Sequence, residues 1–332
     1  MRDLQIAVLG AGVVGVNTAL RIQEEFPSAK ITLIDDKFNE TTLSYGPAGV
    51  FRPAQHFGGI PTDRAKAMIR TSFKYYEQLL NVPDSGVTKL AGYIFSDTHE
   101  NNVKNDFLQG LVPRYRPATL EERQTDSSKL WKHGSYFETM RTQCTLFIPW
   151  ALNKYKQRGG TTRQKHITNL NELQNEYDVV FNCTGLNAKY LCDDPFVVPI
   201  RGQLIKVYAP QLKYFYYNDY DTYIFPLGNG TVCLGGCRNY DSFNTQVDRF
   251  DSMSIIERCS EIVPSLKDAN VLSEWVGLRP HRNVIRLEAE NLGKLKVIHN
   301  YGHCGYGITT APGTADHVVN LFKNSHSTKS KL

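Results

Sequence analysis

The chain has 332 residues, enough for about two domains, and its 41% hydrophobic and 21% charged residues are typical of globular proteins. This composition excludes fibrous and intrinsically disordered classes. The 38 Lys and Arg against 33 Asp and Glu leave a formal charge of +5, too small over this length to indicate a nucleic-acid-binding protein.

The first elements predict a strand, a glycine turn and a helix. Residues 5–9 are apolar, residues 10–15 match GxGxxG, and apolar residues recur at helical spacing from residue 18. The first glycine permits a tight turn, the second lets a pyrophosphate approach the backbone, and the third lets helix and strand pack closely. The next apolar strand, residues 31–34, ends in Asp35 and Asp36, where a ribose-binding carboxylate is expected. The chain therefore begins with a dinucleotide site.

Two later segments predict a return of the chain to this site. Residues 177–185 form an apolar strand ending in small residues, which is either a second approach to the nucleotide or an ordinary strand and turn. Residues 296–309 run from a strand into a glycine loop, and residues 315–322 have helical spacing. This helix start could receive an anion or a flavin carbonyl. Such returns favour a flavin fold over a continuous NAD domain.

The segments between these blocks have another character. Residues 62–80 predict an amphipathic helix. Residues 202–236 alternate and predict antiparallel strands, with a hairpin at residues 228–230, and residues 248–263 are helical.

Six motifs carry a resemblance to a known family. They are GAGVVG at 10–15, PAGVFRP at 47–53, NCTG at 182–185, RGQ at 201–203, GLRPHRNVIRLE at 277–288 and HNYGHCGYGIT at 299–309. In their order and spacing the chain resembles the D-amino-acid oxidase and D-aspartate oxidase family of FAD enzymes over nearly its whole length.

The resemblance implies an α/β fold, α+β overall, with a Rossmann-like FAD-binding domain that is discontinuous in sequence. We expect this domain at 1–55, 140–200 and 287–325, a largely antiparallel substrate domain at 56–139 and 201–286, and a flexible tail at 326–332. The implied reaction is oxidation of a D-amino acid by hydride transfer to flavin N5. Oxygen then yields hydrogen peroxide, and the products are a 2-oxo acid and ammonia.

The resemblance also implies roles for particular residues. Arg286 matches the residue that binds the substrate α-carboxylate, and Tyr223 matches a tyrosine that orients it. Arg279 and Arg282 are expected to be structural ion-pair partners. Cys304 replaces a glycine of the usual loop, so the backbone there is expected to shift. The FAD positions are Gly10, Ala11, Gly12, Val13, Val14, Gly15, Asp36, Lys37, Ser44, Gly49, Val50, Ile167, Thr184, Gly305, Gly307, Ile308 and Thr309.

The substrate class depends on two further arginines. Arg238 ends a strand and matches the acidic-substrate branch of the family, and Arg52 stands where the neutral-substrate enzymes usually have glutamine. A second carboxylate needs a cation to offset its desolvation. Alternatively, Arg238 is a solvated strand-end charge. We therefore expect oxidation of D-aspartate or D-glutamate, with neutral D-amino acids, a neighbouring amine oxidase such as glycine oxidase, or a non-catalytic FAD-binding protein as alternatives.

The location is predicted from three features. Seven cysteines form no CxxC pair, which favours reduced thiols, and no apolar stretch is long enough for a membrane span or a secretory leader. The last residues, Ser330, Lys331 and Leu332, match a peroxisomal address read by an import receptor. The expected partners are thus this receptor, a D-amino acid and oxygen, with neither nucleic acid nor membrane nor metal, and the expected site is the peroxisomal matrix.

Overall fold

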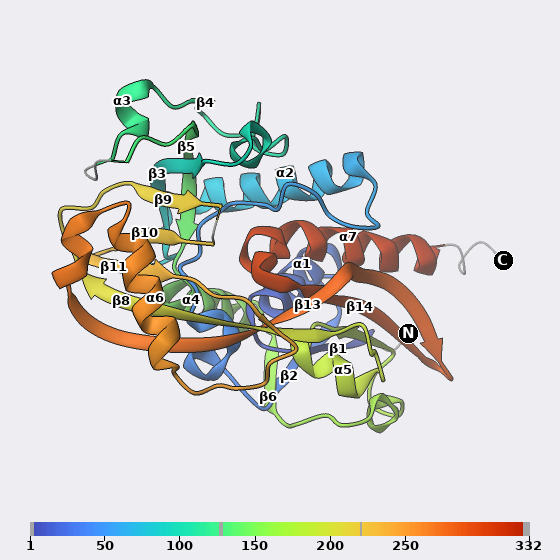
Figure 1. Cartoon of the computed structure of the whole chain (residues 1–332). Coiled ribbons are helices and arrows are strands. Elements are labelled where there is room, and N and C mark those ends of the chain that lie inside the picture. Colours follow the sequence, from blue (N-terminus) through green and yellow to red (C-terminus); the bar gives the residue numbers. More distant parts are fainter. Residues whose placement is uncertain (1–2, 126–128, 220, 328–332) are drawn as a thin grey trace.

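One continuous sheet runs through the molecule and carries the helices on its faces (Figure 1). The computed structural model describes residues 3–125, 129–219 and 221–327. In the described part the strand order is β4-β5-β3-β9-β10-β11-β8-β13-β14-β7-β1-β2-β6, with β12 paired to β8. The α/β fold class predicted from the sequence is confirmed.

The described part of the chain forms fourteen strands and seven α-helices. The strands are β1 Gln5–Leu9, β2 Lys30–Asp35, β3 Val87–Ser96, β4 Tyr115–Pro117, β5 His133–Thr142, β6 Thr161–Gln164, β7 Val179–Asn182, β8 Val198–Tyr208, β9 Phe215–Asn218, β10 Tyr223–Gly228, β11 Thr231–Gly235, β12 Asn239–Tyr240, β13 Asn270–Leu292 and β14 Leu295–His303. The helices are α1 Val13–Glu25, α2 Thr62–Leu79, α3 Leu120–Arg123, α4 Cys144–Gln157, α5 Ala188–Leu191, α6 Arg249–Ser260 and α7 Gly307–Ser327.

The parallel half of the sheet holds the glycine turn. β1 lies between β2 and β7 and is parallel to both, and β14 and β6 extend the half on either side. Ile6, Ala7 and Val8 of β1 are fully buried, because elements cover both faces of this strand. The segment 177–185 is therefore a return to the nucleotide-binding half, since its strand β7 pairs directly with β1.

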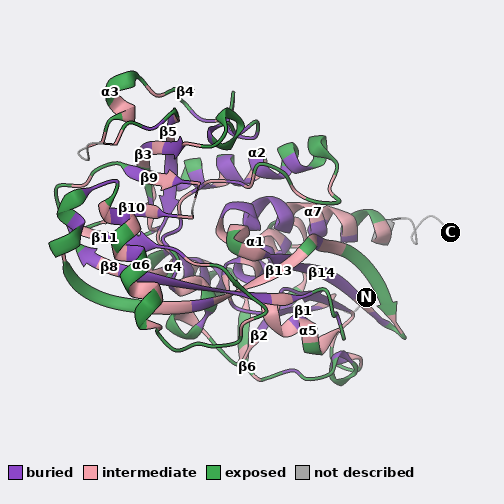
Figure 2. Ribbon diagram, in the orientation of Figure 1, coloured by how far each residue is buried: buried purple, intermediate pink, exposed green. Residues whose placement is uncertain are grey.

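The antiparallel half contains the predicted hairpin. β10 pairs with β11, and the turn between them contains Gly228, Asn229 and Gly230, all with positive φ. Helix α6 covers one face of this half, where Ile255 and Cys259 pack into the buried cluster. The strongly buried strands of both halves form the purple interior of Figure 2, and α6 is exposed or half-buried except at Ile255 and Cys259.

Strand β13 joins the two halves. It pairs with β8 over residues 270–281 and with β14 over residues 281–292, and the register shifts between His281 and Arg286. The long strand is visible in Figure 1 as it crosses the lower part of the view toward β14.

Helix α2, predicted at 62–80, packs on α7. Tyr76 Oη donates a hydrogen bond of 2.7 Å to the carbonyl of Ile308, and the backbone N of Gly313 donates one of 2.9 Å to Ser72 Oγ. Helix α2, from a segment assigned to the substrate domain, thus packs on α7, which follows the glycine loop after β14. The domain boundaries stay a prediction. In the described part, no helix has the length and apolarity needed to cross a bilayer.

Candidate active site

A cavity of about 780 Å³ lies along the carboxyl ends of the parallel strands and continues beneath the antiparallel half. Its volume is typical of small-molecule sites. We call the part lined by Gly12, Ser44, Asp36 and Lys37 the nucleotide end, and the part lined by three arginines the arginine end. These arginines are Arg52, Arg238 and Arg279.

The glycine turn has the close contacts that the sequence pattern predicts. Gly10 has φ +100°, and a Cβ on it would lie 2.4 Å from the carbonyl oxygen of Cys183. A Cβ on Gly15 would lie 1.7 Å from the carbonyl oxygen of Gly10. Both positions therefore require glycine. Gly12 forms the N-cap of α1 with extended backbone, and no side chain caps this helix.

Two carboxylates, one at the last residue of β2 and one directly after it, have different surroundings. Asp35 braces the turn, because its Oδ2 accepts a 2.5 Å hydrogen bond from the backbone N of Ala11. Burial, together with neighbouring Asp36, raises the pKa of Asp35 to about 6. Asp36 lies 3.1 Å from His166 Nδ1, and although burial opposes the shift, Asp35 and the charges of His166 and Lys37 lower its pKa. Asp36 is therefore the carboxylate placed to accept from a ribose.

The glycine loop that follows β14 also reaches the cavity. Gly305, Gly307 and Ile308 line it at the start of α7. Cys304 has φ +52°, the left-handed conformation that glycine favours, so this side chain is accommodated at a cost of about 1–2 kcal/mol. Cys304 thus adopts a backbone conformation that is usual for glycine.

Most of the predicted cofactor positions meet in this cavity. Those in its lining are Gly10, Gly12, Val13, Val14, Asp36, Lys37, Ser44, Gly49, Val50, Ile167, Thr184, Gly305, Gly307, Ile308 and Thr309. Ala11 and Gly15 lie behind the turn, where one donates to Asp35 and the other packs on Gly10.

The nucleotide end fits FAD. A Cβ on Gly12 would lie 3.0 Å from Ser44 Oγ, so a side chain would fill the space that a pyrophosphate needs. Neither α1 nor α7 has an acidic residue in its first turn to compete with an anion. The glycine turn would hold the pyrophosphate, Asp36 the ribose, and the loop around Gly305 the flavin.

At the arginine end, Arg279 of β13 has a guanidinium group with no carboxylate partner in the described part of the chain. Its Nη1 donates to the carbonyl oxygens of Cys237 at 3.1 Å and Arg201 at 3.3 Å. A Cβ on Gly202 would lie 2.3 Å from the guanidinium nitrogens, so this glycine makes room for it. The expectation of an ion pair is wrong for Arg279. It holds for Arg282, whose Nε lies 2.9 Å from Asp194.

Arg286 lies outside the cavity lining, contrary to the expectation that it binds a substrate carboxylate. Its Nη1 donates to Tyr301 Oη at 2.7 Å, and its other nitrogens pair with Glu288 at 2.5 Å and Glu290 at 3.1 Å. Because these partners occupy all three nitrogens, the geometry does not support that role. Arg279 is the arginine of the same motif that reaches the cavity.

Arg238, which follows β11, is partly exposed and paired with a carboxylate. Its Nε pairs with the carboxylate of Asp221, which also accepts a hydrogen bond of 2.6 Å from Tyr217 Oη. Burial lowers the pKa of Arg238 and the charge of Asp221 raises it, with a net shift upward. Arg238 is thus a partly exposed charge at the end of a strand that already has a counter-ion, so the contacts do not decide between a solvated charge and a substrate-binding one.

Arg52 completes a group that we call the rim cluster: Arg52, Tyr217, Asp221 and Arg238. The guanidinium carbon of Arg52 lies 4.0 Å from the centre of the Tyr217 ring, a cation–π contact. No carboxylate pairs with Arg52 among the residues that the structure describes. Its backbone N donates to Thr309 Oγ1 at 3.4 Å, which ties it to the start of α7.

Tyr223 of β10 lines the cavity beside the rim cluster, and its ring is stacked on that of Tyr217 with 6.4 Å between centroids. Its ring stacks on Phe225 with 4.7 Å between centroids, and a Cβ on Gly235 would lie 2.0 Å from it. Burial raises the pKa of Tyr223, and the charge of Arg279 only partly opposes the shift. Its hydroxyl therefore stays protonated at neutral pH and can donate to an anion.

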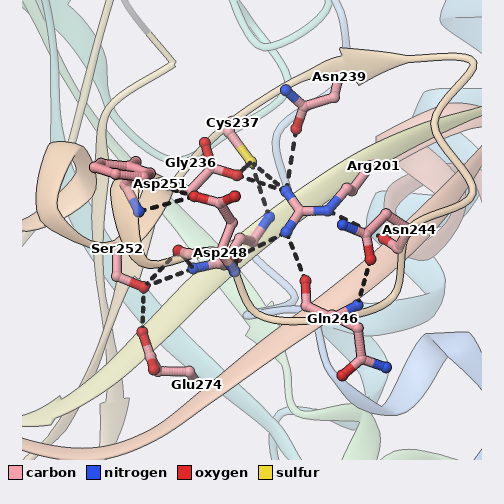
Figure 3. A network of polar contacts seen from close by, with 12 residues as sticks. Arg201, Gly236, Cys237, Asn239, Asn244, Gln246, Asp248, Asp251, Ser252 and Glu274 are labelled. Carbon is pink, nitrogen blue, oxygen red and sulfur yellow. Dashed lines mark hydrogen bonds and ion pairs between the residues drawn. The ribbon is translucent and has the colours of Figure 1, made fainter.

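Buried Arg201 fixes the segment that carries Arg238 (Figure 3). Its side chain is 3% exposed and pairs with Asp251 at 2.6 Å. It also donates to Asn239 Oδ1 at 3.1 Å and to the carbonyl of Gln246 at 2.8 Å. These bonds anchor the connection between β11 and α6 on both sides, so the RGQ motif has a positioning role.

Sequence reasoning missed several lining residues. These are His166, Tyr217, Asp221, Trp275, Arg279 and Tyr306. Two had a local signal, since Tyr306 stands between two predicted cofactor glycines and Arg279 belongs to the motif of Arg286. The contact of Asp221 with Arg238 lies across the open end of the predicted hairpin, but the sequence predicts the turn of that hairpin and not its register. All seven cysteines are free, and the described residues contain no group of three or more His, Cys, Asp or Glu side chains suited to a metal.

Comparison with known proteins gives the same fold and a family. The family described as FAD dependent oxidoreductase matches residues 5–321. The chain is 35% identical to D-aspartate oxidase of Homo sapiens over 324 residues, which cover 95% of this chain and 93% of that one. It is 31% identical to D-amino acid oxidase of Dugesia ryukyuensis, with 96% and 97% covered. The structure of glycine oxidase from Bacillus cereus matches with a TM-score of 0.80 at 19% identity, over 97% of this chain and 96% of that one.

Proposed function

Since the chain belongs to the D-amino-acid and D-aspartate oxidase family of FAD-dependent oxidoreductases, we propose that it oxidises acidic D-amino acids. The substrates are D-aspartate and D-glutamate. The products are the 2-oxo acid, ammonia and hydrogen peroxide.

One observation carries the choice of an acidic substrate. Arg52 and Arg279 line the same end of one cavity, and neither has a carboxylate partner among the described residues. A neutral amino acid offers one carboxylate and so satisfies one of them. An apolar side chain beside the second cation would leave that charge without an anion in a partly closed site. A dicarboxylate satisfies both.

The roles follow from the contacts of each group. Arg279 binds the α-carboxylate through the nitrogens that do not face the carbonyls of Cys237 and Arg201. Tyr223 donates its hydroxyl proton to the same carboxylate. Arg52 and Arg238 bind the second carboxylate, and the cation–π contact with Tyr217 orients Arg52.

The chain positions the substrate for chemistry that the cofactor performs. When bound, FAD would supply the two-electron oxidation of the substrate and the subsequent reaction with oxygen. Two fixed carboxylate contacts determine where the Cα–H bond of the substrate points, which lowers the entropic part of the barrier. Tyr223, whose pKa is raised by burial, stays a hydrogen-bond donor throughout and takes no proton from the amine.

A neutral D-amino acid is the second candidate. The ion pair of Arg238 with Asp221 favours it, because a paired Arg238 is not free to bind a substrate carboxylate. In that case Arg52 would serve the cofactor or the cavity entrance instead of the substrate.

Anaerobic reduction of the enzyme-bound flavin tests the proposal. Protein loaded with FAD is mixed with D-aspartate, D-asparagine, D-glutamate or D-alanine, and bleaching of the flavin is followed. D-Asparagine is the matched control, since it replaces the second carboxylate by an amide. We expect D-aspartate to be far more efficient, and admission of air should then yield hydrogen peroxide. Equal efficiency with D-asparagine contradicts an acidic substrate, and no bleaching with any of them indicates a binding protein.

Peroxisomal import is a separate proposal. Ser330, Lys331 and Leu332 lie outside the described residues, so only their sequence supports it. An N-terminally labelled chain should enter peroxisomes, and removal of the three residues should leave it in the cytosol with unchanged activity. Unchanged peroxisomal location would refute this signal.

A further inference from the structure

The rim cluster contains a carboxylate of its own. Asp221 pairs with Arg238 and accepts from Tyr217 Oη, so two of the groups that would receive a substrate carboxylate already receive this one. All four members of the cluster line the cavity. The contact of Asp221 thus imitates the contact that a second substrate carboxylate would make.

We propose that Asp221 determines specificity by competing with the second carboxylate of the substrate for Arg238 and Tyr217. The inference rests on the proposed function, since it concerns how that site discriminates between acidic and neutral substrates. Asp221 keeps Arg238 paired while the site lacks substrate. A dicarboxylate must displace Asp221 or share Arg238 with it.

Because the pair of Arg238 and Asp221 is partly exposed, displacing Asp221 costs little free energy. The side chain of Arg238 is 40% exposed and that of Asp221 is 28% exposed, so water screens their attraction and solvates the displaced carboxylate. A fully buried pair would hold too tightly to be exchanged. Removing the charge of Asp221 should therefore strengthen dicarboxylate binding about three- to tenfold, the size of a partly exposed charge contact.

Asp221→Asn is the direct test, because the variant keeps the shape and removes the charge. Asp221 has φ +52°, a conformation that asparagine adopts readily, so the turn is preserved. The probes are succinate and succinamate, which differ by one carboxylate, and their dissociation constants are measured from the absorbance change of bound FAD. We expect the preference for succinate to rise about three- to tenfold in the variant.

Asp241→Asn is the matched control. Asp241 is exposed, lies outside the cavity lining and also has a positive φ, +55°, so this variant changes net charge equally without touching the rim cluster. Its preference for succinate should equal that of the unmodified protein. Asp221→Glu, which keeps the charge, should also stay close to that value.

A double variant identifies the partner. In protein that carries Arg238→Gln, adding Asp221→Asn should change the preference much less than in the unmodified protein, because the contested guanidinium group is gone and only Tyr217 remains. An unchanged or lower preference in Asp221→Asn alone overturns the inference and makes Asp221 a residue that only orients Arg238. The proposed function is refuted by a different result, namely that the unmodified protein oxidises D-asparagine as efficiently as D-aspartate. The binding measurement with succinate does not depend on that result.

Discussion

Replacing Arg279 by methionine tests which arginine binds the substrate α-carboxylate. Arg286→Met is its matched control, because both arginines lie in one motif and on one strand, β13, but only Arg279 lines the cavity. Methionine keeps much of the length of the side chain and removes its charge and its hydrogen-bond donors.

The magnitude follows from the contacts of Arg279. One nitrogen faces two backbone carbonyls, which leaves the rest of the guanidinium group for the substrate. Removing one partner of a hydrogen-bonded charge pair costs about 2–5 kcal/mol. Arg279 is only partly buried, so we expect the lower part of this range, about 2–4 kcal/mol. This corresponds to a loss of about 30- to 1000-fold in kcat/KM.

The assay is steady-state oxidation of D-aspartate and D-alanine with each variant. Arg279→Met should lower kcat/KM equally for both substrates, since both carry the α-carboxylate. Arg286→Met should keep kcat/KM within about threefold but lower the free energy of unfolding by about 1–2 kcal/mol, because Tyr301 and Glu290 lose their partner. If Arg286→Met instead abolishes activity while Arg279→Met retains it, our reasoning from the cavity is refuted.

Three other predictions test the rest of the site. Gly12→Val should prevent retention of FAD during gel filtration, because the side chain would meet Ser44 where the pyrophosphate packs, and a fully yellow variant would contradict this. Arg52→Gln should lower the ratio of kcat/KM for D-aspartate over D-asparagine about three- to tenfold, and an unchanged ratio would assign selectivity to Arg238 alone. Asp35→Asn should stabilise the FAD-free protein above pH about 6 and leave its stability unchanged below pH about 4. Burial raises the pKa of Asp35 from 3.8 to about 6, so ionisation of this carboxyl group destabilises the folded state relative to the unfolded one. Equal urea midpoints of the variant and the unmodified protein at high pH would show that this destabilisation is absent.

The nucleotide end could be predicted because segments whose backbones pack closely require glycine at fixed positions in the sequence. Gly10 and Gly15 must lack a side chain for the turn to pack. The hairpin around Asn229, in the antiparallel half, was predictable for a similar reason, since its turn needs residues that accept positive φ. Such requirements concern near neighbours, so residue type and spacing were enough.

The arginine end could be predicted only in part, because it depends on register and on distant contacts. Three arginines stand close together in the segment 277–288, and the register shift after His281 decides which of them faces the cavity. The partner of Arg238 is Asp221, which precedes a different strand. The two residues flank the hairpin of β10 and β11, so their contact depends on the register of that hairpin, which the sequence does not determine.

The continuity of β13 has a mechanical consequence. One strand is hydrogen-bonded to the antiparallel half over its first residues and to the parallel half over its last, so the halves cannot swing apart without breaking backbone ladders on both sides. Entry of substrate and release of product therefore require movements of side chains and short connections near the arginine end. Such movements take nanoseconds to microseconds, whereas domain closure takes microseconds to milliseconds. The fold thus separates a rigid frame, which holds the cofactor and substrate in alignment, from the few groups that must move in each turnover.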